Sequence, residues 1–170
     1  MDVRRTGEDA AVATAWDEPG ARNLYIEPQV TRLLWSFAHW TGKSLSDTAL
    51  PAVEQAQRLF HAPFVVLSHN TAPDPILNYA NRAGLNLFQV TWEELMALPS
   101  RRTAEPSEQV ERERLLATVA RQGYIDNYRG VRIAKSGRRF LIEQATVWSL
   151  LDENGAHYGQ AAMFSQWKFL

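Results

Sequence analysis

The sequence predicts an α+β domain: a five-stranded antiparallel sheet with short helices on one face and an N-terminal helical extension. From 124 to 167, apolar residues recur at every second position, interrupted by Ser136-Gly137 and Asn154-Gly155. This alternation with tight turns predicts three consecutive strands. Upstream, the runs 64–68 and 76–79 are compact, apolar and flanked by prolines, which predicts two more strands.

Two-residue turns would set the strand partners in the C-terminal ribbon. They place Trp148 opposite Ala161, Leu150 opposite Gly159, Ile133 beside Phe140, and Val131 beside Ile142. With a side-chain period of two, one face is then expected to form the core. That face carries Val131, Ile133, Phe140, Ile142, Thr146, Trp148, Leu150, Met163 and Trp167.

The opposite face of the ribbon is also rich in apolar residues. It carries Tyr128, Leu141, Ala145, Val147, Leu151, Tyr158, Ala162 and Phe164. A solvated antiparallel face would alternate more strictly, so part of this face is expected to be covered. The expected cover is the N-terminal third of the chain or a second copy.

Helices are expected in five places. One begins at Pro28 and stops at Gly42, and another runs from about Thr48 to His61. Short helices should follow Asn81 and Thr91, which suit N-caps, and a longer one should run from a cap at Ser107 to Gly123, with Glu108 spaced to pair with Arg112. The predicted organisation is a loose tail over 1–22, a helical extension over 23–62 that packs on the sheet or on a dimer partner, and a core over 63–170.

Composition excludes several classes of function. The 170 residues are 45% hydrophobic and 22% charged, which is typical of a single globular domain. A formal net charge of -1 gives no general attraction for nucleic acid or for anionic membranes. The chain has no cysteine, which excludes disulfides, thiolate metal sites and a cysteinyl flavin adduct. With no apolar run of membrane-spanning length, a cytoplasmic location is expected.

The order of elements is similar to that of PAS domains, and several segments resemble the MEKHLA family. These segments are 62–69, 74–81, 91–95, 98–102, 128–133, 136–140, 145–148 and 159–162, within a match over about 28–167. That family occurs as stand-alone bacterial proteins, which this chain resembles, and at the end of plant homeodomain leucine-zipper transcription factors. The resemblance implies a sensing or regulatory module and supplies no catalytic residues. Neither a zipper nor a DNA-binding segment is evident here, so the plant context is not expected to apply.

A pocket between the sheet and the short helices would be lined by Tyr79, Phe88, Phe140, Trp148 and Met163, unless these side chains simply fill the core.

Two adjacent arginines, Arg101 and Arg102, lie on a loop that would border this pocket. They could bind a carboxylate or phosphate, or they could pair with nearby glutamates. Asn81 could hydrogen-bond a ligand, although capping the following helix is favoured.

Other chemistry has little support in the sequence. The histidines have no metal-ligand spacing, so no metal site is expected, and haem or noncovalent flavin is disfavoured. No nucleophile elbow or paired acid and base is evident, so an enzyme is not expected.

The favoured function is therefore a small-molecule sensor that acts through a protein partner or a change of oligomer; the alternatives are a ligand-free scaffold module and an enzyme of unrecognised type. Homodimerisation is expected through Leu33, Leu34, Trp35, Phe37, Trp40, Val147 and Phe164.

Overall fold

The computed structural model describes residues 17–170, so most of the predicted tail over 1–22 lies outside the described residues. The helices are η1 (Ala21–Ile26), α2 (Glu27–Thr41), α3 (Ala52–Phe60), α4 (Arg82–Phe88), α5 (Trp92–Met96), η2 (Ser100–Thr103) and α6 (Pro106–Gln122). The strands are β1 (Val65–His69), β2 (Leu77–Ala80), β3 (Tyr124–Ile133), β4 (Arg139–Leu151), β5 (His157–Phe164) and β6 (Gln166–Phe169).

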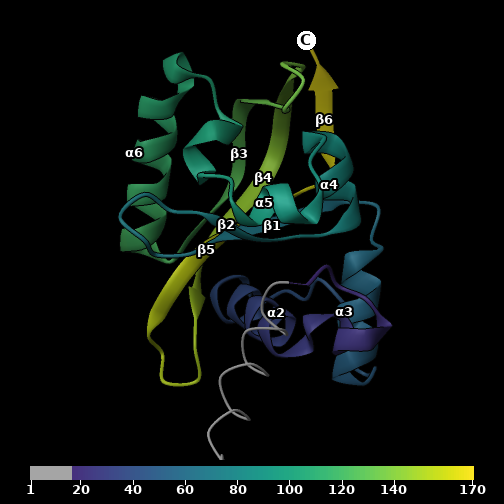
Figure 1. Cartoon of the computed structure of the whole chain (residues 1–170). Coiled ribbons are helices and arrows are strands. Elements are labelled where there is room, and N and C mark those ends of the chain that lie inside the picture. Colours follow the sequence, from purple (N-terminus) through teal and green to yellow (C-terminus); the bar gives the residue numbers. More distant parts are fainter. Residues whose placement is uncertain (1–16) are drawn as a thin grey trace, which may run out of the picture.

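The strands form one antiparallel sheet in the order β2-β1-β5-β4-β3, and β6 pairs with the first part of β4. Figure 1 shows α4, α5 and α6 on one side of this sheet and α2 and α3 on the other. The predicted α+β architecture, with its five-stranded antiparallel sheet, is confirmed; β6 is an additional short strand at the C-terminus.

The Asn154-Gly155 hairpin has the predicted partners, since Trp148 pairs with Ala161 and Leu150 with Gly159. The first hairpin differs from the prediction. Ala134 N–H donates to Arg138 O at 2.9 Å, which leaves a three-residue loop in which Gly137 has a φ of 90°.

That extra loop residue shifts the β3–β4 register by one position. Ile133 pairs with Arg139 and Arg132 with Phe140, so the predicted pairs of Ile133 with Phe140 and Val131 with Ile142 are wrong. A one-residue shift reverses the face of every side chain in one strand relative to the other. Arg132 therefore lies on the same face as Phe140.

A second reversal occurs inside β4 at Gln144, whose φ of 53° lies in the left-handed region. The buried positions change from even numbers, Phe140 and Ile142, to odd numbers, Ala145 and Val147, across this irregularity. The predicted core face is therefore split: Trp148, Leu150 and Met163 lie on the face opposite to Phe140 and Ile142.

Helix α2 covers the face that carries Trp148 and Leu150. Its residues Val30, Leu33 and Phe37 are buried in the same apolar cluster as those two side chains. The rings of Phe37 and Trp148 meet edge to face with centroids 5.0 Å apart. Both faces of the sheet are covered, as expected. The N-terminal helix, however, lies on the face predicted to form the core.

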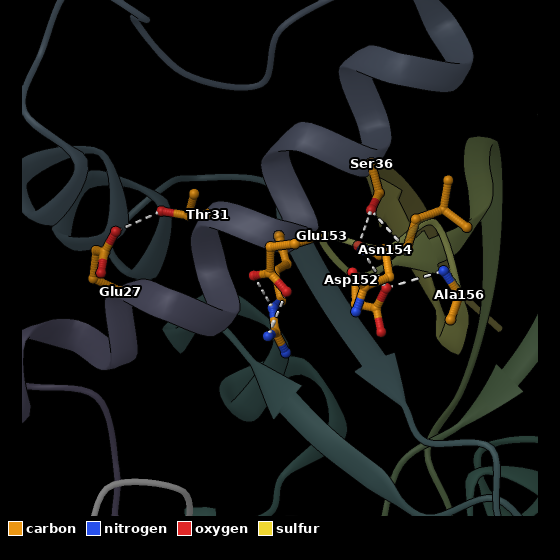
Figure 2. Close-up of polar contacts among 9 residues, drawn as sticks. Glu27, Thr31, Ser36, Asp152, Glu153, Asn154 and Ala156 are labelled. Carbon is orange, nitrogen blue, oxygen red and sulfur yellow. Dashed lines mark hydrogen bonds and ion pairs between the residues drawn. The ribbon is translucent and has the colours of Figure 1, made fainter.

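Polar contacts fasten α2 to the end of the β4–β5 hairpin (Figure 2). The Ser36 hydroxyl accepts from Leu151 N–H at 2.9 Å and donates to Leu151 O at 3.3 Å. Arg32 makes a two-pronged ion pair with Glu153, and Trp40 Nε1 donates to Ser149 O at 2.9 Å. The helix is therefore held to the strand along its length.

Helix ends follow the predicted caps in most places. Gly42 and Gly123 end α2 and α6 with positive φ, and the side chains of Asn81 and Thr91 cap α4 and α5. Two predicted starts are wrong. Helix α3 begins after Pro51, whose extended ψ of 149° keeps it outside the helix, and α6 begins at Pro106 rather than after a Ser107 cap. Among residues 17–170, no helix is both long and apolar enough to span a bilayer.

Candidate ligand cavity

A cavity of about 60 Å³ lies between the sheet and α6, on the face that carries Ile142 and Val147. Its volume is about twice the ~30 Å³ share of one water molecule in the liquid, well below the roughly 300–1,000 Å³ of drug-sized ligand sites. Most of its wall is apolar, with side chains from three strands, α4 and α6: Leu67, Phe88, Leu115, Ile142, Val147 and Phe164.

Two buried arginines also line this cavity. Arg112 comes from α6 and is 6% exposed, and Arg132 comes from β3 and is 7% exposed. Burial and the nearby Arg132 charge lower the pKa of Arg112 to about 10. A guanidinium is still protonated at neutral pH with such a pKa, so the cavity wall holds two positive charges out of water.

The hydrogen bonds of these arginines go mostly to neutral groups. Arg112 donates to the Ser100 hydroxyl, and Arg132 donates to Val131 O at 2.7 Å and to the Tyr128 hydroxyl at 3.2 Å. The Tyr128 hydroxyl donates in turn to Glu111 at 2.7 Å. No ion pair joins either arginine to a carboxylate within residues 17–170.

Gly130 makes room for this arrangement on β3. A Cβ at this position would lie 2.4 Å from the Tyr128 hydroxyl oxygen and 3.1 Å from a guanidinium nitrogen of Arg132. Both distances are shorter than ordinary contacts, so the absence of a side chain lets the tyrosine and the arginine lie across the strand. The local sequence Tyr-Arg-Gly-Val-Arg thus builds one wall of the cavity.

His69 supplies a further polar group to the cavity wall. Its Nδ1 lies 2.8 Å from Asn70 O, so this nitrogen carries the hydrogen, while the buried Nε2 has no hydrogen-bond partner in the described part of the chain. Burial lowers the pKa of His69 below its ordinary value, which favours the neutral ring. In that state Nε2 is an acceptor without a donor.

The residues predicted to line a pocket do not come together. Phe88 lines the cavity, and Phe140 packs behind it with ring centroids 5.3 Å apart. Trp148 and Met163 belong to the opposite face of the sheet, because of the reversal at Gln144 in β4. Tyr79 packs against Trp92 at 6.2 Å.

Asn81 has no hydrogen-bonding capacity left for a ligand. Its side-chain oxygen accepts from Val66 N–H and Gly84 N–H, both at 3.1 Å. Its amide nitrogen donates to Leu59 O at 3.1 Å and to Phe64 O at 2.7 Å. These contacts give no support to the ligand-binding role considered for Asn81, whereas its capping role is confirmed.

The adjacent arginines Arg101 and Arg102 lie away from the cavity, in an open groove of about 580 Å³ between η2 and the β3–β4 turn. Both are exposed, and Arg101 pairs with Asp74 at 3.2 Å. This groove is larger than the cavity. Lys135 and Glu94, which form an ion pair, are among the residues that line it. Both arginines of the cavity are more than nine-tenths buried, whereas those of the groove are exposed, so we regard the cavity as the stronger candidate.

The residues predicted for a dimer interface fall into separate groups. Leu33 and Phe37 are buried against the sheet, and Leu34 and Trp40 are partly buried. Trp35 is 52% exposed and stacks on His39. Val147 and Phe164 line the cavity at 5% and 1% exposure, which contradicts their assignment to an exposed interface.

The two cavity arginines were missed by the sequence reasoning, although a signal existed for one of them. Arg112 lies three positions before Leu115 and seven before Val119, so it falls within the apolar stripe of α6. Its predicted partner Glu108 forms no ion pair with it. Arg132 had no such signal, because its burial depends on the one-residue shift in the first hairpin.

A metal centre finds no support in residues 17–170, where no group of three or more His, Asp or Glu side chains is placed to hold an ion.

Solved structures with a similar fold are PAS and light-oxygen-voltage domains. A PAS domain from Colwellia psychrerythraea superposes with a TM-score of 0.58 at 14% identity, covering 69% of this chain and 94% of that one. A fungal light-oxygen-voltage photoreceptor domain gives a TM-score of 0.55 at 18% identity and covers 83% and 91%. At this level of identity the similarity establishes the fold.

Sequence relatives include plant homeobox-leucine zipper proteins. The chain is 29% identical over 166 residues to ATHB-9 of Arabidopsis thaliana, covering 89% of this chain and 19% of that protein. It is 30% identical over 142 residues to ATHB-14 from the same plant, covering 79% and 16%. The chain thus spans less than a fifth of these relatives.

The family model for the MEKHLA domain matches residues 28–169, which include α2, the whole sheet and the cavity. This chain belongs to the MEKHLA domain family.

Proposed function

We propose that this chain is a sensory or regulatory domain that binds a small molecule in the cavity between the sheet and α6. The observation that carries the proposal is the pair of buried arginines facing this cavity, neither of which has a carboxylate ion-pair partner among residues 17–170. Burying a charge without a counter-charge is costly, and proteins keep such arrangements mainly at functional sites. The PAS and light-oxygen-voltage neighbours support a sensory role as a fold-level analogy.

Strand β4 offers a direct route from the cavity to the outer helix. Val147 lines the cavity, and the next residue, Trp148, packs on Phe37 of α2 from the other face. A ligand that shifts β4 would therefore change how α2 packs on the sheet. We propose that the output passes through α2 to a protein partner or to a second copy, with exposed Trp35 as a contact.

The cavity volume also bears on the cofactor. About 60 Å³ is too small for a flavin or a haem in this conformation. We therefore propose a ligand of a few non-hydrogen atoms and no enzymatic turnover. The main rival is a ligand-free scaffold module, which the close packing around this small cavity favours.

Native mass spectrometry with an absorbance spectrum of the purified chain tests the proposal. A retained small molecule, or a thermal shift on adding one, supports sensing, with light scattering reporting any change of oligomer. A chain that carries no ligand and whose melting temperature no small molecule alters would support the scaffold instead.

A further inference from the structure

The charge arrangement around the cavity points to the class of ligand. Arg112 and Arg132 are both more than nine-tenths buried, and the Arg132 charge, after burial itself, lowers the pKa of Arg112. Glu111 reaches this network only through the Tyr128 hydroxyl. The Glu113 and Asp74 carboxylates raise the pKa of Arg112 but form no ion pair with it, so an anion placed between the two guanidiniums would supply a direct counter-charge that the described part of the chain does not provide there.

The remaining walls limit what that anion can be. Arg112, Arg132 and Ser100 supply guanidinium and hydroxyl groups to the wall, with Arg112 donating to the Ser100 hydroxyl, whereas Leu115, Ile142 and Val147 present only carbon. An inorganic phosphate needs hydrogen-bond donors on all sides, and several of its oxygens would face those carbon atoms. A carboxylate with a short apolar tail meets donors at one end and hydrocarbon at the other.

We infer that the cavity binds a short-chain carboxylate of two to three carbons, with Arg112 and Arg132 as the groups that hold the carboxylate. This inference rests on the sensory function proposed above and names its ligand class. The acid of acetate or propionate size matches a volume of about 60 Å³. A hydroxyl on that acid could donate to the unpartnered His69 Nε2, so lactate should bind more tightly than propionate.

Isothermal titration calorimetry with propionate, acetate, lactate and inorganic phosphate tests the inference, with chloride used to hold the ionic strength constant. Saturable binding of the carboxylates is expected, together with a rise in melting temperature. Arg112→Gln and Arg132→Gln should each raise the Kd about 10- to 100-fold, since each removes a charged hydrogen bond. Arg114→Gln is the matched control, because Arg114 is an exposed arginine on the same helix.

A wild-type measurement covers the case in which an arginine variant fails to fold. Nuclear Overhauser effects between the methyl group of bound propionate and the methyl groups of Val147 or Leu115 would place the ligand in the cavity. Carboxylate binding that survives both arginine substitutions would overturn the assignment of Arg112 and Arg132, and phosphate binding in its place would overturn the carboxylate; either result leaves sensing intact. No binding of any small molecule, charged or neutral, would overturn both.

Discussion

Removing the side chain of Asn81 should destabilise the fold strongly. This side chain is fully buried and joins three elements, because it bonds the backbone of α3, β1 and α4 and of the short link before β1. In Asn81→Ala the N–H groups of Val66 and Gly84 lose their acceptor inside the core. The carbonyl of Phe64 loses a donor.

Each buried polar group left without a partner costs about 1–3 kcal/mol, and loss of an N-cap alone costs about 1 kcal/mol. Leu59 O keeps a second donor, the Ala62 N–H, so loss of its bond to Asn81 adds little to the cost. We expect Asn81→Ala to lower the free energy of unfolding by about 3–5 kcal/mol, against a typical total of about 5–15 kcal/mol. Urea denaturation followed by tryptophan fluorescence measures this change.

The exposed Asn86 on the same helix provides the control, and Asn86→Ala should stay within about 0.5 kcal/mol of wild type. Asn81→Asp keeps the acceptor but turns a carboxylate oxygen toward two carbonyls, so it should also destabilise. A loss below about 1 kcal/mol in Asn81→Ala would refute the reasoning that this residue is committed to the fold.

Three further predictions follow from single contacts. Gly123→Ala should destabilise by at least about 2 kcal/mol, because φ is 93° and a Cβ would lie 2.3 Å from the Trp40 ring. Gly42→Ala is the control, because Gly42 also has positive φ but a Cβ there would meet open space, and it should cost only about 1 kcal/mol. Equal losses of stability for the two variants in urea titrations would contradict the clash with the Trp40 ring. Ser36→Ala leaves a backbone N–H at the end of β4 unpaired and should cost about 1–3 kcal/mol by thermal unfolding; an unchanged melting temperature would argue against this bond. Burial lowers the pKa of His69 in the folded state, so below the ordinary value of 6.5 the unfolded chain binds a proton that the folded chain does not. The free energy of unfolding should therefore fall as pH drops below 6.5, and should fall less in His69→Asn. If the free energy depends on pH with the same slope in both proteins, His69 is not the cause.

Much of the architecture could be predicted because its signals are local. Gly42 and Gly123 end helices, Asn81 and Thr91 begin them, and Asn154-Gly155 sets its hairpin, each through bonds within a few residues. The candidate cavity was not predicted, because its charged residues lie on elements whose facing depends on strand register. Of the residues proposed for the pocket, Phe88 is the one that lines this cavity in the described part of the chain.

The side of the sheet on which each residue lies was decided by small irregularities, one of which is Asn127 of β3, with a φ of 54° at a shift of the β3–β4 register. The three-residue loop ending at Gly137 and the left-handed Gln144 each reverse a face, and neither leaves a clear mark in the hydrophobic alternation. Both faces of the ribbon are apolar, so the alternation alone could not say which face α2 covers. Packing of Phe37 on Trp148 settles that point in the folded chain.

By itself, therefore, the sequence determined the fold class, the order of the elements, most helix ends and the family to which the chain belongs. The first three depend on composition, periodicity and short-range hydrogen bonds, whereas the family follows from the match of the sequence to the MEKHLA domain. Only the tertiary structure decided which residues share a face, and with them the cavity. Arg112 and Arg132 are 20 positions apart in the sequence and come together through strand register and helix packing, which are long-range properties of the whole sheet.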